Sequence, residues 1–329
     1  MPSAKLCTNM GSQNNSKHMD LADLDKYLEE ALQRSAKVLN LSHRGLTIVT
    51  NNLAKLTCVK QLSLNDNSLL MPPSELASLV CLEELVLDNN QLTMLPQGIG
   101  NLRRLRTLSA CNNPLGVVPS EIGNLTCLSH LWLVSCQLAS LPPEIGRLTN
   151  LLVLSARKNN LSSIPEELGE LQKLQWLCLE ENQLEALPEE TGKLQSLTYL
   201  NVNSNRFNTI PKCVLHLPSL VSLHMKSNCV SRVPDDTILD LSQLSRLDLR
   251  ENYLHHRPPH WKGLEYILLG QEDLGEGVPT PEATTYVISS HKASTLASVP
   301  EFNEEEEDED EERTEDEGRT EDECSWQEG

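Results

Sequence analysis

Three histidines, His255, His256 and His260, are the residues of this sequence whose type and spacing best fit metal chemistry. Imidazole nitrogens bind zinc and similar ions, and zinc sites use histidines that are separated by a few residues. The alternative is that these histidines lie in a solvated turn. We adopt the turn, and we predict that the protein has no metal site.

Sequence motifs for catalysis are also missing. The chain contains no nucleophile elbow, P-loop, dinucleotide-binding fingerprint or His-Glu-x-x-His sequence. The glycines Gly275 and Gly277 form too short a motif and do not follow a predicted strand. We therefore predict that the protein has no catalytic residue and no cofactor, and that it is not an enzyme.

The ten cysteines do not form a pattern that binds a metal or builds a disulfide framework. No Cys-x-x-Cys pair occurs, while Cys58 and Cys81 stand in equivalent places 23 residues apart. Cysteines that are not clustered are typical of reduced thiols. We expect the thiols of this chain to be reduced.

The elements that would position any functional residue are sequence repeats of constant length. Each repeat contains Leu-x-Leu-x-x-Asn-x-Leu, as in the segment from Leu85 to Leu92. The asparagine position recurs with a spacing of 23 and finally of 24, at Arg44, Asn67, Asn90, Asn113, Cys136, Asn159, Asn182, Asn205, Asn228 and Asn252. A fixed period of this length predicts a solenoid.

A second column, with the sequence Leu-Pro-x-x-Ile-Gly-x-Leu, fills the other half of each repeat. Its prolines are Pro72, Pro96, Pro119, Pro142, Pro165, Pro188, Pro211 and Pro234. The two columns together resemble the leucine-rich repeat family, specifically its 23-residue intracellular subfamily of SHOC-2, Ras-suppressor and Scribble-type proteins. The resemblance covers roughly residues 36–275. It implies an α/β solenoid, a right-handed horseshoe with a parallel β-sheet on its concave face.

The composition fits such a solenoid, because the chain has 61 Leu but only 11 Phe, Tyr and Trp residues. Alternate side chains of a strand point to the same side, so the paired leucines of each repeat fill the core. One repeat cannot bury its leucines alone, whereas stacked repeats can. We predict about ten repeats and a degenerate eleventh around Ile267, with the prolines on the convex side.

Both ends of the array need a cover, because their leucines would otherwise meet water. At the start, Asp20 is expected to cap an amphipathic helix whose apolar face contains Leu21, Leu24, Leu28, Ala31 and Leu32. At the other end, Trp261, Leu264, Tyr266 and Ile267 are expected to close the last repeat. The predicted parts are a disordered N-terminus (1–19), a capping helix (20–35), the repeat solenoid (36–275), a linker (276–300) and an acidic disordered tail (301–329).

The net charge of −20 belongs mainly to this tail, where 17 acidic residues face two arginines. The rest of the chain has no basic excess, so we exclude nucleic acid as a general partner. Thr314 and Thr320 each precede acidic residues, a context that casein kinase 2 type kinases phosphorylate. The tail is either only a solubilising segment or a binding site for a basic partner.

The localisation is predicted from what the sequence lacks. No run of 18 apolar residues occurs, which excludes a transmembrane helix, and the first 20 residues have no apolar stretch of signal-peptide length. We therefore expect a cytoplasmic protein, with a nuclear location as the alternative, and we expect a monomer.

The concave face is the surface where sequence predicts a function. Strand residues beside the paired leucines point into the concave trough. In the middle repeats these residues are large or charged, and tryptophan, tyrosine and arginine are enriched at binding hot spots. The alternative is that they only cover aliphatic neighbours. We predict a protein-binding site made of His130, Trp132, Arg157, Lys158, Trp176, Glu180, Glu181 and Tyr199.

Three functions remain as hypotheses. The first is a non-enzymatic scaffold or adaptor that binds a protein partner on the concave face, and the resemblance implies Ras-type signalling as one setting. The second is a nuclear protein that binds histones or other basic proteins through its tail, since acidic leucine-rich nuclear phosphoproteins look similar. The third is substrate recognition for a ubiquitin ligase. Sequence alone does not identify the partner.

Overall fold

The structure, a computed structural model, describes residues 19–254 and 257–269. All of these residues belong to one compact unit of the chain, Met1–Gly277. A second unit, Val278–Gly329, lies outside the described residues, and so do the predicted linker, the acidic tail and almost all of the predicted N-terminal segment.

One parallel sheet runs through the described unit, and its eleven strands are hydrogen-bonded in sequence order. The strands are short, and in each of the first ten the middle residue is an aliphatic side chain that is almost completely buried. The strands are β1 Val38–Asn40, β2 Gln61–Ser63, β3 Glu84–Val86, β4 Thr107–Ser109, β5 His130–Trp132, β6 Val153–Ser155, β7 Trp176–Cys178, β8 Tyr199–Asn201, β9 Ser222–His224, β10 Arg246–Asp248 and β11 Ile267–Leu268. This sheet confirms the predicted leucine-rich solenoid.

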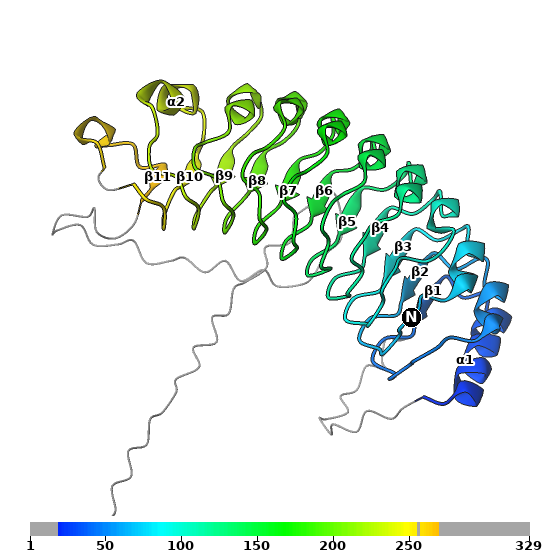
Figure 1. The fold of residues 1–329 in the computed structure, drawn as a ribbon. Coiled ribbons are helices and arrows are strands. Elements are labelled where there is room, and N and C mark those ends of the chain that lie inside the picture. Colours follow the sequence, from blue (N-terminus) through cyan, green and yellow to red (C-terminus); the bar gives the residue numbers. More distant parts are fainter. Residues whose placement is uncertain (1–18, 255–256, 270–329) are drawn as a thin grey trace, which may run out of the picture. The chain divides into compact units, whose positions relative to one another are not determined.

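Short helices line the side of the unit opposite the sheet (Figure 1). Most of them are 3₁₀ helices of a single turn or slightly more, because each repeat leaves only a few residues between its proline and its next leucine. They are α1 Leu21–Gln33, η1 Asn51–Lys55, η2 Ser74–Ser78, η3 Ile99–Asn101, η4 Ser120–Asn124, η5 Pro143–Arg147, η6 Glu166–Glu170, η7 Glu189–Lys193, η8 Lys212–His216, α2 Asp235–Asp240 and η9 Pro259–Trp261. We call one strand with the helix that follows it a coil.

The proline column lies at the starts of these helices, and one of its members differs from the sequence prediction. Pro119, Pro142 and Pro165 are N-cap residues, and in the second coil the N-cap is Pro73. The prediction of Pro72 for this column is therefore wrong by one position. Pro73 restores the regular spacing of 23 to Pro96, and it supplies the extended backbone that a helix needs at its N-cap.

Glycine allows the helices of neighbouring coils to approach closely. A Cβ atom on Gly169 would lie 2.3 Å from the backbone oxygen of Glu190 in the next coil. The equivalent atom on Gly146 would lie 2.4 Å from the oxygen of Glu167. Any side chain at these two positions would therefore separate the coils.

Buried asparagines bind most coils to the one before. The Oδ1 atom of Asn159 accepts hydrogen bonds from the backbone N–H groups of Cys136 and Leu138, at 3.0 and 2.9 Å. Its Nδ2 atom donates to the carbonyl groups of Leu133, Ala156 and Arg157. One side chain thus satisfies five backbone groups that would otherwise be buried without a partner.

Cys136 interrupts this asparagine ladder between the fourth and fifth coils. Its thiol donates to the carbonyl groups of Ala110 and Val134, but sulfur is a weak acceptor. The backbone N–H of Leu115 therefore donates to the carbonyl of Asn113 within its own coil instead of to the following coil's side chain. Gly116 follows with a φ of 70°, so the local backbone differs from that of the other coils.

The longer repeat step near the C-terminus has a structural cause. The coil between β9 and β10 carries the α-helix α2, Asp235–Asp240, in place of a 3₁₀ helix, and this helix holds one residue more than 3₁₀ helices such as η4 and η5. The sheet register adjusts to it, because Leu247 pairs with Leu223 and Arg246 with Ser222. The extra residue is thus absorbed opposite the sheet, which continues unchanged.

Both ends of the described unit are covered. In α1 the Asp20 carboxylate accepts a hydrogen bond from the N–H of Asp23, and Leu24, Leu28 and Ala31 are buried. Leu21 and Leu32, which we expected on the same buried face, are 45% and 40% exposed. At the other end Trp261 and Ile267 are buried, and Leu264 and Tyr266 pack partly against the core.

None of the helices in the described part of the chain combines the length and the apolar character that crossing a membrane requires.

Candidate functional site

The predicted site residues come from four consecutive coils of the sheet. His130 and Trp132 begin and end β5, Trp176 begins β7, and Tyr199 begins β8. Because the central leucine of each strand is buried, its two flanking residues project on the other side of the sheet. Arg157, Lys158, Glu180 and Glu181 lie just beyond β6 and β7, where the chain leaves the sheet.

Four rings form a continuous row across this face, which we call the aromatic ladder: Trp132, Trp176, Tyr199 and His224. The ring centroids of Trp132 and Trp176 are 5.6 Å apart, although a strand lies between them. Trp176 and Tyr199 are stacked, and the Tyr199 and His224 centroids are 4.9 Å apart. These separations lie within the range in which aromatic pairs attract one another. All four rings are half-buried.

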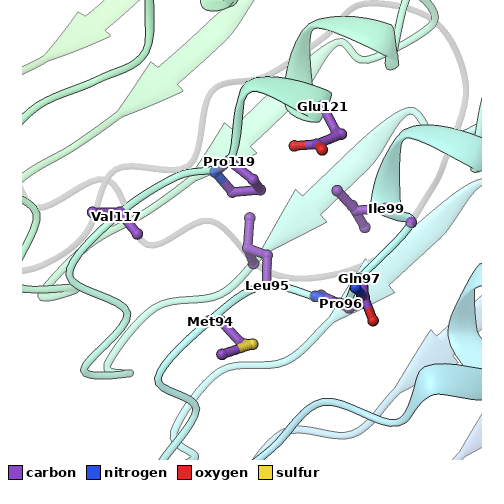
Figure 2. Close-up of a pocket in the computed structure, with 9 residues that line it drawn as sticks. Met94, Leu95, Pro96, Gln97, Ile99, Val117, Pro119 and Glu121 are labelled. Carbon is purple, nitrogen blue, oxygen red and sulfur yellow. The ribbon is translucent and has the colours of Figure 1, made fainter.

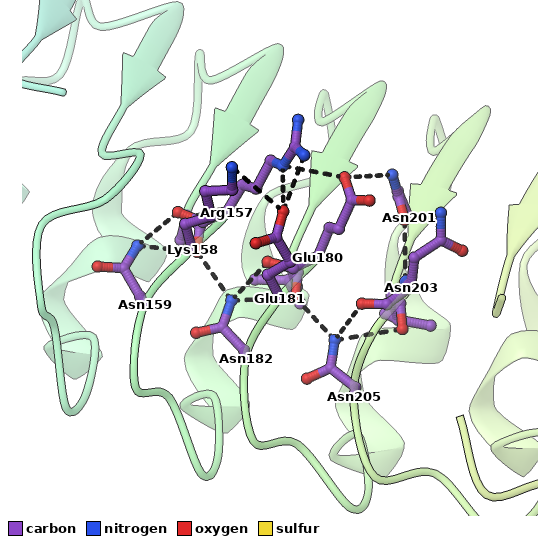
Figure 3. Close-up of polar contacts among 12 residues, drawn as sticks. Arg157, Lys158, Asn159, Glu180, Glu181, Asn182, Asn201, Asn203 and Asn205 are labelled. Carbon is purple, nitrogen blue, oxygen red and sulfur yellow. Dashed lines mark hydrogen bonds and ion pairs between the residues drawn. The ribbon is translucent and has the colours of Figure 1, made fainter. Parts of the chain in front are cut away.

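Arg157, Lys158, Glu180 and Glu181 form a cluster of charged residues (Figure 3). The Arg157 guanidinium donates through Nη2 and Nε to Oε1 of Glu181, at 2.8 and 3.0 Å. Its Nε atom is also 3.2 Å from Oε2 of Glu180, and the Lys158 ammonium is 3.7 Å from Glu181. Burial alone would lower the pKa of Arg157, but the hydrogen bond to Glu181 and the charge of Glu180 more than offset it and raise the pKa.

Asn201 connects the charged cluster to the aromatic ladder. Its Nδ2 atom donates to Oε2 of Glu180 at 3.2 Å and lies 3.5 Å from the Tyr199 hydroxyl. Its Oδ1 atom accepts from the backbone N–H of Asn203. Asn201 is itself buried, so the contact holds the Glu180 carboxylate and the Tyr199 ring in fixed positions.

Several residues that we expected to face the open trough are covered instead. Val153, Ser155 and Cys178 are 4%, 2% and 3% exposed. Val153 and Ser155 belong to β6, the strand across which the Trp132 and Trp176 rings meet. Glu180, which we expected to present a charge to a partner, is also buried. The rings themselves are half-buried and keep part of their surface exposed.

The titratable groups of the ladder are neutral near pH 7. Burial raises the pKa of the Tyr199 hydroxyl to about 12. Burial, followed by the charge of Arg246, lowers the pKa of His224 to about 4, and burial also lowers the pKa of His130. A tyrosine that stays protonated beside a histidine that stays neutral presents an uncharged surface for contact. Such a surface suits binding better than proton transfer.

The two flanks of the aromatic ladder carry different charges. Toward β2 and β3 the face holds Asp66, Glu84 and Asp88, and burial raises the pKa of Asp88. At the β10 end, the guanidinium groups of Arg246 and Arg250 both lie beside the buried carboxylate of Asp248. The flank at β2 and β3 is therefore acidic, whereas at the β10 end basic groups are paired with acidic ones, as in the ion pair of Lys226 with Glu251.

A pocket of about 300 Å³ lies elsewhere, between the helix starts of the third and fourth coils (Figure 2). It lies beside Gly98, whose φ of 77° precedes η3, a helix shorter than its neighbours. Met94, Leu95, Ile99 and Val117 make the pocket apolar, and Glu121 is the titratable group among its lining residues. A lone carboxylate in an apolar pocket has no nucleophile or base beside it to form a catalytic site.

The predicted phosphorylation sites and two of the three histidines that we considered as metal ligands lie beyond the described residues. This is true of His255, His256, Thr314 and Thr320. His260 is described, and its Nε2 atom is 2.7 Å from Oδ1 of Asp235. In residues 19–254 and 257–269, no three histidine, cysteine or acidic side chains gather as metal ligands.

His224, the last ring of the ladder, was not among the residues predicted from sequence. It follows Leu223 in β9 and pairs with Asn201 in the sheet register. The repeat pattern therefore already placed His224 on the same face of the sheet as the predicted residues. The predicted set ends one strand earlier, at Tyr199. Nothing in the spacing indicates that the Tyr199 and His224 rings meet, because one begins its strand and the other ends its strand.

The repeats, the buried asparagines and the parallel sheet agree with a match to known protein families. A family model for a leucine-rich repeat region matches residues 32–160 and 162–257. The chain belongs to the leucine-rich repeat family. No curated protein sequence matches the chain at a significant level.

Solved structures of other leucine-rich repeat proteins resemble this one. A leucine-rich repeat protein of Leptospira interrogans is 32% identical, with a TM-score of 0.64 over 74% of this chain and 68% of that protein. The ectodomain of the Arabidopsis thaliana receptor kinase GASSHO1/SCHENGEN3, in complex with CASPARIAN STRIP INTEGRITY FACTOR 2, is 27% identical with a TM-score of 0.57. That match covers 71% of this chain but 31% of the ectodomain.

A third similar structure is the Arabidopsis receptor kinase HAESA in complex with the peptide hormone IDA and the co-receptor SERK1. It is 26% identical, with a TM-score of 0.53 over 65% of this chain and 40% of that receptor chain. This chain therefore spans less than half the length of either plant receptor chain.

Proposed function

We propose that this protein binds a protein partner on its sheet face, with Trp132, Arg157, Trp176 and Tyr199 as anchors. The observation that carries this proposal is the aromatic ladder. Four rings in contact present a continuous apolar surface in the middle of a face whose other strands carry mainly small, polar or charged residues. Large aromatic side chains that are half-buried before binding lose little conformational entropy when a partner covers them.

The neighbouring charges add selectivity to this surface. Lys158 and Glu181 keep 49% and 35% of their side chains exposed, whereas the Glu180 side chain is 11% exposed. Lys158 and Glu181 therefore set the charge pattern, His130 adds a polar ring whose pKa is lowered by burial, and Glu180 acts by holding Arg157 in place. A partner must match a positive and a negative group that stand close together, which disfavours partners with uniform charge.

The structural relatives are consistent with protein or peptide binding. Two of the similar structures are complexes of plant receptors, one with CASPARIAN STRIP INTEGRITY FACTOR 2 and one with the peptide hormone IDA. For this chain we propose the same general mode of action, a binding module without catalysis. The sequence pattern extends the proposal to a cytoplasmic, monomeric scaffold in Ras-type signalling of the SHOC-2 kind.

Proximity labelling in cells tests the proposal by comparing the intact chain with the double variant Trp132→Ala and Trp176→Ala. We expect one or more labelled proteins to disappear from the double variant while its melting temperature stays within several degrees of the wild type. The matched control is Tyr253→Ala, which removes an aromatic side chain that is 62% exposed and lies away from the ladder. Loss of the same proteins in this control, or no loss in the double variant, would contradict the proposal.

A second candidate function rests on the composition of the acidic tail. The 17 acidic residues among residues 301–329 favour binding of a basic protein such as a histone, in the nucleus. Removal of the tail distinguishes the two functions. A histone pull-down that is lost with the tail supports the second, whereas binding that is lost with Trp132 and Trp176 supports the first.

A further inference from the structure

We propose that Cys58 and Cys81 are a redox-sensitive pair that forms a disulfide between neighbouring coils when it meets a disulfide oxidant such as oxidised glutathione. Both thiols are free, Cys58 is exposed and Cys81 is partly exposed. This modification is separate from the aromatic ladder. Cys58 and Cys81 lie just before β2 and β3, whereas the ladder begins at β5.

The sheet register places the two cysteines side by side. Gln61 of β2 pairs with Glu84 of β3, so residues three positions earlier, Cys58 and Cys81, occupy the same place in adjacent coils. The hydrogen bond from the N–H of Glu83 to the carbonyl of Lys60, at 2.7 Å, shows that the ladder extends toward them. Parallel strands lie about 4.8 Å apart. A disulfide joins Cα atoms roughly 4.4–6.8 Å apart, so the spacing suits a bridge.

Side chains at this repeat position do reach one another in other coils. Asn150 and Lys173 occupy the same position, and the Lys173 ammonium donates to Oδ1 of Asn150 at 2.8 Å. Arg104 occupies it in the coil after Cys81, and the Arg104 Nη1 atom is 3.9 Å from the Cys81 sulfur. Side chains at this position thus point toward the same position of the neighbouring coil. At Cys58 and Cys81, two consecutive coils both have a cysteine at this repeat position.

The other described cysteines lack this combination, and Cys229, which is partly exposed, has Arg206 and Tyr253 instead of cysteines at its equivalent positions in the adjacent coils. Burial raises the pKa values of the Cys136 and Cys178 thiols to about 12 and of the Cys111 and Cys213 thiols to about 11, which keeps them in the unreactive thiol form. Cys127 is exposed and occupies the same repeat position as Cys58. Its neighbours there are Arg104 and Asn150, so it has no thiol partner in an adjacent coil.

The proposed reaction is two thiol–disulfide exchanges. The Cys81 thiolate attacks one sulfur of oxidised glutathione, and the glutathione disulfide bond breaks to give a mixed disulfide and one glutathione thiolate. The Cys58 thiolate then attacks the Cys81 sulfur and releases the second glutathione thiolate. The two protons from the cysteines go to the two glutathione molecules, so the protein pair is oxidised and one oxidised glutathione is reduced. The Arg104 guanidinium beside Cys81 attracts the anionic oxidant to this thiol first.

The bridge would stabilise the N-terminal end of the solenoid. In a repeat array each coil contacts only its neighbours, so the terminal coils open most easily. A covalent link between the coils of Cys58 and Cys81 closes a loop and removes conformations from the unfolded ensemble. Oxidation would therefore hold together the coils that lie next to α1.

The test treats the intact folded protein with oxidised glutathione, blocks free thiols, and maps the products by mass spectrometry. We expect an intramolecular cross-link between the peptides of Cys58 and Cys81, and a glutathione adduct on Cys127. In Cys58→Ser the cross-link must vanish and Cys81 must carry a stable glutathione. The matched control Cys127→Ser must leave the cross-link unchanged.

Two results would overturn the proposal. One is the presence of a separate glutathione on each of Cys58 and Cys81, or of two free thiols, in the wild-type protein under conditions that modify Cys127. The other is a Cys58 or Cys81 disulfide that joins two chains, visible as a dimer on a non-reducing gel. Cys127 reports in both cases whether the oxidant reached an exposed thiol at the same repeat position.

Discussion

The indole of Trp176 is stacked on the phenol ring of Tyr199, with ring centroids 5.3 Å apart and planes inclined by 10°. The two residues begin adjacent strands and are directly paired in the sheet register. The sheet itself therefore sets their separation, and stacking needs no adjustment of the backbone. The pair stiffens the centre of the aromatic ladder, which favours binding because little order must be gained when a partner arrives.

We predict that Trp176→Ala costs little stability compared with removal of a buried tryptophan. The half-buried Trp176 ring should contribute about 1–2 kcal/mol through stacking and partial burial. Trp261→Ala removes a side chain that is 2% exposed and should cost about 3–5 kcal/mol. Chemical denaturation of both variants measures the free energies of unfolding. Equal losses would show that Trp176 is mainly a structural residue.

Asn159→Ala should destabilise the protein strongly, by about 2–4 kcal/mol, because five backbone groups in two coils lose their partner. The matched control is the neighbouring Asn160→Ala, whose side chain is exposed and should change the free energy of unfolding by less than about 0.5 kcal/mol. Urea titration followed by circular dichroism compares the two. A small effect at Asn159 would mean that water replaces the amide in the ladder.

The stability of the protein should fall as the pH drops from about 6.5 to about 4, partly because of His224. Its pKa in the folded protein is lowered from 6.5 to about 4 by burial and by Arg246. Between these values the unfolded chain binds a proton that the folded chain does not, so acid favours unfolding.

In His224→Gln this contribution disappears, so the variant should lose about 2 kcal/mol less stability than the wild type between pH 7 and pH 4.5. Unfolding curves at several pH values measure the difference. The exposed His216→Gln serves as control and should follow the wild type. Identical pH dependence in the wild type and His224→Gln would show that the His224 imidazole is solvated in the folded state.

The strand positions could be predicted from sequence because they depend on a strict local rule. Leucines that alternate within a repeat of fixed length must share one side of a strand, so the repeat pattern alone places Trp132, Trp176 and Tyr199 on the opposite side. The helix type was less predictable. The coil around Asp235 holds an α-helix instead of a 3₁₀ helix because of one extra residue. The repeat spacing shows that this coil has an extra residue, but it does not show which type of helix results.

The contacts of the candidate site were beyond the reach of sequence. Spacing places Glu180 beside the trough, but its burial depends on how Arg157 and Asn201 reach across two neighbouring coils. The meeting of Trp132 and Trp176 depends on side-chain length, because their strands are not adjacent. Such contacts depend on side-chain conformations, which the repeat pattern of the sequence does not predict.

Cys136 has a mechanical consequence for the array. The asparagine amides fasten neighbouring coils together, and at this junction a thiol with poorer bonding replaces the amide. Bending or pulling should therefore concentrate there, just before the coil that carries Trp132. The repeats on either side then behave as two stiff blocks, one with strands β1–β4 and one with the aromatic ladder, and the angle between them can change when a partner contacts both.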